Sequence, residues 1–317
     1  MKVLVTGADG FVGAVLVRRL LRDGHAVSGT IRRNEDLRGD RFTSEERRAV
    51  SWIPYELADD ASAREAAAGG WDAVYHLAAV ASVAQAQLHP GATWNENAGG
   101  TARLVWELAQ ARQRGSADPS VILISSIEVY GAGPAVPRVE TDPVAPVSAY
   151  AASKVGAEAA GLQEWRRSGL RVVVARPSSH TGQGQSDRGF VPRYARRIRA
   201  AKQRGAPAIA TGILDGVRDF LHVDDVVEAY TRLSTDGRPG EIYNVSSGTG
   251  VALEKVVRRL EALAGWDGLH EVASGEIRRD AVPYLVGDSG KLRAATGWAP
   301  RHTLDQTLQA VLDAQTD

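Results

Sequence analysis

The stretch Gly7-Ala8-Asp9-Gly10-Phe11-Val12-Gly13 lies near the start of the 317-residue chain and decides how its first half folds. It follows a β-branched apolar run at 2–6 and opens a segment of helical periodicity at 11–23. Three glycines at this spacing allow a tight turn, close approach of backbone to a diphosphate, and close packing of helix on strand. A strand, a glycine turn and a helix in this order therefore predict a dinucleotide site at the helix N-terminus. Its candidate cofactor-binding residues are Gly7, Asp9, Gly10, Phe11, Val12 and Gly13.

Short apolar runs alternate with helical patterns along the rest of the first half. Strands are predicted at 2–6, 26–31, 51–55, 73–77, 121–125, 172–175 and 241–245, and helices at 11–23, 93–114 and 148–168. This alternation is typical of a mostly parallel sheet with helices on both faces. The predicted fold class is α/β, a doubly wound parallel Rossmann sheet.

The regular alternation weakens after about residue 176, where Gly/Pro-rich loops begin. Helical patterns follow near 190–204, 222–235, 252–264, 288–296 and 303–313. We expect residues 1–176 to form the dinucleotide-binding Rossmann domain, with 216–247 returning to it. Residues 177–215 and 248–317 are then predicted to form a smaller α/β C-terminal lobe that binds the substrate.

Composition excludes several classes of function. The chain has no cysteine, which excludes a disulfide scaffold, a cysteine-ligated zinc site and a thiol nucleophile. Its 38 basic residues balance 38 acidic ones, so no overall field favours nucleic acid or an anionic membrane. No apolar run approaches the roughly 18 residues of a membrane span, and the first apolar stretch is too short for a signal peptide. We expect a cytoplasmic protein with no metal site and no nucleic-acid or membrane partner.

The end of the second expected strand indicates which dinucleotide is bound. Sites for NAD usually place an acidic residue there to hold the ribose 2′-OH. This chain reads Thr30-Ile31-Arg32-Arg33, with no carboxylate before Glu35. A guanidinium can hold a 2′-phosphate through two charge-assisted hydrogen bonds, so Arg32 favours NADP(H). The alternative is a pair of arginines that merely face solvent.

Residues after the next two strands complete the predicted cofactor site. Glu56 and Leu57 should border the adenine, and Leu77, Ala78 and Ala79 should pass under the ribose and nicotinamide.

Tyr150 and Lys154 form a Tyr-x-x-x-Lys pair at the spacing of one helical turn, which places phenol and ammonium on one face. A free tyrosine has a pKa of about 10, too high for efficient acid–base work at neutral pH. A lysine about 4 Å away is worth up to ~4 kcal/mol at an effective dielectric of 20, so we expect Lys154 to lower the pKa of Tyr150. Ser126 ends the fifth strand just upstream, where its hydroxyl can polarise the same substrate oxygen.

These motifs together resemble the extended short-chain dehydrogenase/reductase family, whose members act on nucleotide sugars. The matches run nearly end to end, and within the family the chain most resembles the GDP-4-keto-6-deoxymannose reductases. They include the glycine turn, Tyr75-His76-Leu77-Ala78-Ala79, Asn97 with Gly100-Thr101, Ser125-Ser126, Tyr150 with Lys154, Ala175-Arg176-Pro177, His180-Thr181-Gly182-Gln183-Gly184-Gln185, Arg218-Asp219-Phe220-Leu221, Val282-Pro283-Tyr284-Leu285-Val286-Gly287-Asp288 and Gly297-Trp298.

The resemblance implies roles for particular residues. Ser126, Tyr150 and Lys154 would be catalytic, with Lys154 also holding the nicotinamide ribose, and Arg218 would bind the diphosphate of a sugar nucleotide. The implied substrate-binding residues are Ser82, Asn97, Ser126, Glu128, Ser179, Arg193, Arg218 and Arg278. Taken alone, Arg218 is better explained as a surface salt-bridge partner, and His180 as a hydrogen-bonded loop residue. The resemblance also implies a homodimer through the helices at 93–114 and 148–168.

Two positions depart from the family pattern. The family often has Asn at the place of Ser179, so the resemblance does not by itself imply the usual substrate hydrogen bond there. Glu56 replaces a more usual Asp, which is a mild change.

The reaction is less determined than the fold. Related dehydratases carry Thr-Asp-Glu or Thr-Ser-Glu where this chain has Ser126-Ile127-Glu128, and isoleucine can donate no proton. A 4-epimerase keeps NAD bound and would prefer an acidic residue where Arg32 stands. We therefore expect an NADPH-dependent reductase of a nucleotide-linked 4-keto-6-deoxy sugar. A dehydratase, an epimerase and a non-catalytic NADP-binding regulator remain the alternatives.

Overall fold

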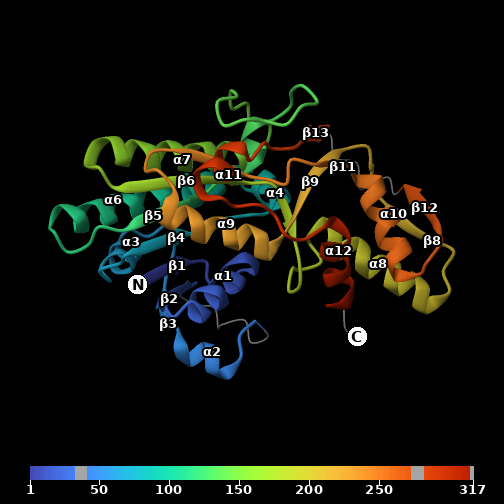
Figure 1. Cartoon of the computed structure of the whole chain (residues 1–317), viewed down its shortest axis with the longest axis horizontal. Helices are drawn as coiled ribbons and strands as arrows, with labels where there is room; N and C mark the ends of the chain where they lie inside the picture. The colour runs from blue at the N-terminus through green and yellow to red at the C-terminus, as the bar shows by residue number, and fades with distance from the viewer. Residues whose placement is uncertain (33–40, 273–281, 315–317) are drawn as a thin grey trace.

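The structure is a computed structural model that describes residues 1–32, 41–272 and 282–314. Its main feature is a seven-stranded sheet in the order β3-β2-β1-β4-β5-β6-β10, in which all neighbouring strands run parallel (Figure 1). The strands are β1 (Lys2–Thr6), β2 (Ala26–Ile31), β3 (Ser51–Pro54), β4 (Ala73–His76), β5 (Ser120–Ile124), β6 (Arg171–Pro177) and β10 (Ile242–Val245). The predicted α/β class and doubly wound parallel sheet are therefore confirmed.

Helices cover both faces of this sheet because its strands are apolar on both sides. In β1, Val3 and Val5 pack into one apolar cluster, whereas Leu4 between them packs into another on the opposite face. The first cluster is covered by α1 (Phe11–Arg22), α9 (Val223–Asp236) and α11 (Gly290–Thr296), and the second by α3 (Asp60–Ala67), α6 (Gly100–Gln113) and α7 (Ala149–Ser168).

The strand order reverses at β1, which has β2 on one side and β4 on the other. At such a switch point the loops after neighbouring strands diverge and leave a crevice at the carboxyl ends of the strands. The glycine turn after β1 therefore lies at the edge of the sheet where ligands bind in this class of fold.

The later elements form a separate, third apolar cluster beside the sheet, at the right of Figure 1. They include α8 (Phe190–Arg204), β8 (Ala208–Thr211), α10 (Leu253–Ala264), β12 (Leu269–Val272) and α12 (Leu304–Asp313). Between them and the sheet, β9 (Val217–His222) pairs with β7 (Ser179–Thr181), β11 (Gly250–Ala252) and β13 (Tyr284–Leu285). Strand β10 returns to the sheet beside β6, as expected, while the division of the chain into two domains stays a prediction.

The long helix expected at 93–114 is three consecutive elements: α5 (Pro90–Trp94), a π-helical turn η1 (Asn95–Gly99), and α6. The short elements α2 (Ser44–Ala49), α4 (Val83–Leu88) and the 3₁₀ turn η2 (Ile127–Tyr130) complete the described chain. Nowhere in the described ranges is a helix long and apolar enough to cross a membrane.

Candidate active site

The glycine turn adopts a conformation that favours glycine. Gly7 has a φ of +65°, and its N–H donates to Thr30 Oγ1 at 3.1 Å. A Cβ on Gly13 would lie 2.1 Å from the carbonyl oxygen of Gly7, whereas a Cβ on Gly10 would meet only that oxygen, at 3.0 Å. The turn is thus tightly packed at Gly7 and Gly13 and more open at Gly10. Gly10 lies just before α1, which begins at Phe11. This cradle fits a dinucleotide diphosphate held by backbone N–H groups.

The other predicted cofactor residues follow neighbouring strands at the same edge of the sheet. Ala78, after β4, donates its N–H to Thr6 Oγ1 at 3.0 Å and lies against Gly7. Leu57, after β3, packs against the start of α6, whereas Val12 packs against the apolar core. Arg32 follows β2 with 57% of its side chain exposed, and its Nη2 lies 4.0 Å from Glu96 Oε2. The loops after β1, β2, β3 and β4 therefore all lie at the carboxyl edge of the sheet.

Ser126, Tyr150 and Lys154 come together at the carboxyl end of β5. Ser126 caps η2 by accepting the N–H of Glu128 at 3.2 Å, and its hydroxyl also hydrogen-bonds Tyr150. Tyr150 and Lys154 occupy the first turns of α7, which begins at Ala149 with Ser148 as its N-cap. Lys154 is 6% exposed, and its Nζ lies 5.9 Å from the centre of the Tyr150 ring. The phenol, ammonium and hydroxyl thus form one group.

The electrostatics of this group differ from the expectation. Burial raises the pKa of Tyr150, the negative charge of Glu128 raises it further, and the Ser126 hydrogen bond lowers it only in part. Burial lowers the pKa of Lys154 to about 8, against the opposing effect of Glu158. The ammonium of Lys154 donates to the Ile124 carbonyl oxygen at 2.8 Å rather than to the phenol. The expected lowering of the Tyr150 pKa by Lys154 is therefore wrong for this structure, and the phenol keeps its proton at neutral pH.

Asn97 lies beside this group on the π-helical turn. Its Oδ1 accepts the N–H of Val80 at 2.7 Å, and its Nδ2 donates to Val80 O at 3.1 Å and to Ser153 Oγ at 2.9 Å. The side chain is buried, so it ties the loop after β4 to α7. Binding of substrate by Asn97 stays a prediction, since its amide is already engaged within the protein.

The remaining candidate substrate residues are spread over several elements. Ser82 caps α4, accepting the N–H of Gln85 at 3.2 Å, and Glu128 lies on η2, where its charge acts on Tyr150. Arg193, on α8, donates to Arg188 O at 2.9 Å.

Two further candidates lie on β7 and β9, which pair side by side. Ser179 begins β7, and Arg218 lies on β9 and donates to the carbonyl oxygen of Val217 at 2.9 Å. His180, next to Ser179, contacts Ser178 O through Nδ1 at 2.9 Å and stacks on Phe11, in keeping with a structural role. Arg278 lies outside the described residues.

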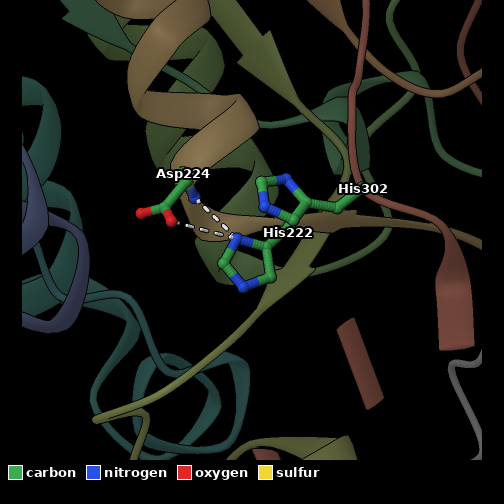
Figure 2. A group of neighbouring side chains, drawn as sticks. All are labelled: His222, Asp224 and His302. Atoms are coloured by element: carbon green, nitrogen blue, oxygen red, sulfur yellow. Dashed lines mark hydrogen bonds and ion pairs between the residues drawn. The ribbon is translucent and has the colours of Figure 1, made fainter. Parts of the chain in front are cut away.

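One group of side chains resembles a metal site in composition. His222, Asp224 and His302 place one ligand atom each within 4.8 Å of one another (Figure 2). His222 Nδ1 accepts the N–H of Asp224 at 3.1 Å as the cap of α9, and His302 Nδ1 lies 3.0 Å from Asp225 Oδ1. The two rings stack 4.1 Å apart, so their in-plane lone pairs do not converge on one point. These contacts explain the group as a helix cap, and the absence of a metal stays a prediction.

A buried network under the site was not expected from the sequence. Glu158 is 4% exposed and contacts both Arg176 and Ser125. The spacing in the sequence could have indicated it. Glu158 follows Lys154 by four residues, which puts the two side chains on one face of a helix.

A Rossmann sheet with a glycine turn after its first strand, and with Ser, Tyr and Lys at its carboxyl edge, fits a nicotinamide-dependent dehydrogenase or reductase. Comparison with known proteins agrees with this class. The chain belongs to the NAD dependent epimerase/dehydratase family, whose sequence profile matches residues 3–246. It is therefore an NAD(P)-dependent enzyme.

Individual relatives cover most of the chain. A GDP-6-deoxy-D-mannose reductase of Pseudomonas aeruginosa is 36% identical over 244 residues, which span 76% of this chain and 79% of the relative. A dTDP-glucose 4,6-dehydratase of Streptomyces griseus is 31% identical over 318 residues, spanning 98% and 92%. The solved structure of RMD from Pseudomonas aeruginosa complexed with NADPH matches with a TM-score of 0.83 and 31% identity, covering 99% of this chain and 98% of that one.

Proposed function

We propose that this protein is an NADPH-dependent reductase that converts a nucleotide-linked 4-keto-6-deoxy sugar to the 6-deoxy sugar. The nucleotide that we propose is GDP. The observation that carries the proposal is Ile127. At the position where the resembling dehydratases have Asp or Ser, this side chain is 2% exposed and packs with Val282 and Leu285. It can neither donate a proton nor hold a water, so elimination of the C6 hydroxyl lacks its acid.

The protonation state of Tyr150 supports the reductive direction. Reduction of a carbonyl consumes a proton, and a dehydratase or epimerase begins with an oxidation that must remove one. Because burial raises the pKa of Tyr150, the phenol is present as the acid at neutral pH. NADPH supplies the hydride when bound; Ser126 polarises the carbonyl oxygen and Tyr150 gives it a proton.

Recognition of the nucleotide is assigned to cations and hydroxyls around β9. Arg218, on this strand, and Arg193, on α8, are the residues proposed to hold the diphosphate. Binding of this remote part of the substrate places the carbonyl beside Ser126 and Tyr150. We therefore propose that the free keto sugar, without its nucleotide, is a poor substrate.

The proposal is tested with GDP-4-keto-6-deoxymannose and NADPH, which should be consumed in equal amounts and yield the 6-deoxy sugar nucleotide. Failure with every 4-keto-6-deoxy nucleotide sugar tried, together with conversion of an intact GDP- or UDP-hexose without net NADPH use, would establish a dehydratase or an epimerase instead. Tight NADPH binding with no turnover of any of these sugars would indicate a non-catalytic regulator.

A second prediction concerns the cofactor. Arg32 should make the protein bind NADPH more tightly than NADH, because the guanidinium gains a charge-assisted pair with the 2′-phosphate. Such a pair is worth roughly 1.5–3 kcal/mol, or about 10- to 100-fold in affinity. Arg32→Glu should abolish or reverse this preference, measured by fluorescence titration of both cofactors. Arg114→Glu, just after the far end of α6, is the charge-matched control and should leave the preference unchanged. Equal binding of both cofactors by the unaltered protein would contradict the role of Arg32.

The homodimer also stays a proposal. Helices α6 and α7 pack side by side. Trp106 of α6 is 48% exposed, and the guanidinium carbon of Arg167 lies 4.4 Å from the centre of the Trp106 ring. Trp94 of α5 is 51% exposed nearby on the same run of helices. Exposed tryptophans of this kind are enriched where proteins associate.

A further inference from the structure

Glu158 is a buried carboxylate with an unusually complete set of partners. Its two oxygens accept a parallel pair of hydrogen bonds from Arg176, Nε to Oε1 at 2.9 Å and Nη2 to Oε2 at 2.6 Å. Oε1 also accepts the hydroxyl of Ser125 at 2.5 Å. Glu158, Arg176 and Ser125 are respectively 4%, 3% and 2% exposed. The bidentate pair offsets part of the loss of water around both charges, while the buried Nη1 of Arg176 has no hydrogen-bond partner among the described residues.

The network meets the proposed catalytic group at three points. Glu158 lies one turn beyond Lys154 on the same face of α7. Ser125 comes directly before Ser126 in the chain. The carbonyl oxygen of Ile124, the last residue of β5, accepts a hydrogen bond from the ammonium of Lys154 at 2.8 Å. One carboxylate thus holds the end of β5, the end of β6 through Arg176, and the helix that carries Lys154.

We propose that Glu158 is a positioning residue that keeps the buried ammonium of Lys154 charged and fixed against the end of β5. This inference rests on the proposed role of Lys154 in binding the cofactor and assisting Tyr150. Arg176 and Ser125 hold the carboxylate of Glu158 in place through three hydrogen bonds. The charge of Glu158 raises the pKa of Lys154 against the lowering caused by burial.

Other charged or titratable groups around Lys154 come from several elements. Tyr150 lies on α7 itself, and Glu128 on η2 acts on that tyrosine. His76, at the end of β4, is fully buried, and burial together with the charge of Lys154 lowers its pKa to about 3, so it is neutral. The positive charge of Arg176 lies beyond Glu158. Glu158 is therefore the anion whose charge the structure couples to Lys154.

The test measures NADPH affinity against pH in the full-length protein. In the unaltered protein, affinity should fall as the pH rises through about 8, where Lys154 loses its proton. In Glu158→Gln, which keeps the size and the acceptor for Ser125 but not the charge, the fall should begin about one pH unit lower. The alkaline limb of the turnover profile should shift in the same direction.

Glu164→Gln is the matched control. Glu164 lies on the same helix, is 2% exposed, and pairs with Arg167 at 2.6 Å, but it is nearly three turns from Lys154. Its removal should change stability without moving the pH profile. Should Glu158→Gln fail to fold because Arg176 is left as a lone buried charge, the double variant Glu158→Gln/Arg176→Gln removes both charges and allows the same measurement.

The outcomes separate this inference from the function on which it rests. If the unaltered protein shows the fall in affinity and the Glu158 variants show it at the same pH, the role of Glu158 is overturned. If the unaltered protein shows no fall, the assignment of Lys154 to the cofactor is overturned and this inference with it. Failure to reduce any keto sugar would contradict the proposed reaction. The dependence of NADPH affinity on pH could still be measured, and it would still test the role of Glu158.

Discussion

Tyr150→Phe is expected to lower turnover of the keto-sugar substrate by roughly 10²–10⁴-fold, the usual contribution of a positioned general acid. The substitution keeps the ring beside Lys154 and removes only the hydroxyl that Ser126 contacts. The dissociation constant of NADPH should change little, because the predicted cofactor contacts come from the glycine turn, Arg32 and Lys154. Steady-state kinetics and fluorescence titration of the same preparation measure both quantities.

Tyr75→Phe is the matched control for this substitution. Tyr75 is also a buried tyrosine with a raised pKa, and its hydroxyl donates to Ser234 Oγ at 2.8 Å, away from the proposed active site. Losing this hydrogen bond should cost about 1 kcal/mol of stability and leave turnover near that of the unaltered protein. Near-full activity of Tyr150→Phe would show that another group donates the proton.

Much of the fold could be predicted because local signals and burial agree in the first half of the chain. The run Val3-Leu4-Val5 is apolar at every position, and the structure shows why: successive side chains serve clusters on opposite faces of the sheet. Strands such as β7, β11 and β13 have two or three residues each, too few to show any periodicity. Their positions depend on pairing with β9, a contact between distant segments that no local pattern records.

The candidate site was predicted unevenly for a related reason. Spacing alone placed Tyr150 and Lys154 on one face of a helix, and strand order placed Ser126 at the same edge of the sheet. The direction of the Tyr150 pKa could not be predicted, because it depends on burial and on where the Lys154 ammonium points. The contacts of Asn97 could not be predicted either, because this residue lies on a π-helical turn, which a pattern of apolar residues does not reveal.

Lys154→Met is expected to separate stability from function, losing cofactor affinity and turnover while making the protein without cofactor more stable at neutral pH. Burial lowers the pKa of Lys154 from its ordinary value of 10.5 to about 8, so the folded state holds this proton less tightly than the unfolded state. A difference of this size corresponds to a destabilisation of about 3 kcal/mol. Methionine removes it, at a cost of roughly 1 kcal/mol for the lost hydrogen bond to Ile124. A net gain of about 2 kcal/mol is expected, as in other active sites where function opposes stability.

The pH dependence of this gain has a definite sign. Below about pH 8 lysine is protonated in both the folded and the unfolded state, so the destabilisation is fully present. Between about 8 and 10.5 the unfolded state binds more protons, so the unaltered protein gains stability as the pH rises. The advantage of Lys154→Met should therefore be largest at neutral pH and shrink across this window, as measured by urea denaturation at several pH values.

The control for this measurement is Lys202→Met. Lys202 also donates to a backbone carbonyl, that of Ala264 at 2.7 Å, but from an exposed position on α8. Its replacement should leave NADPH affinity unchanged and give no gain in stability at pH 7, because the Lys202 side chain is exposed and lies outside the proposed active site. A Lys154→Met protein that is less stable than the unaltered one at pH 7 would mean that the ammonium is better compensated by Glu158 and Ile124 than its burial implies. If instead it binds NADPH as tightly as the unaltered protein, Lys154 does not hold the cofactor, and proton transfer by Tyr150 must be supported by Ser126 alone.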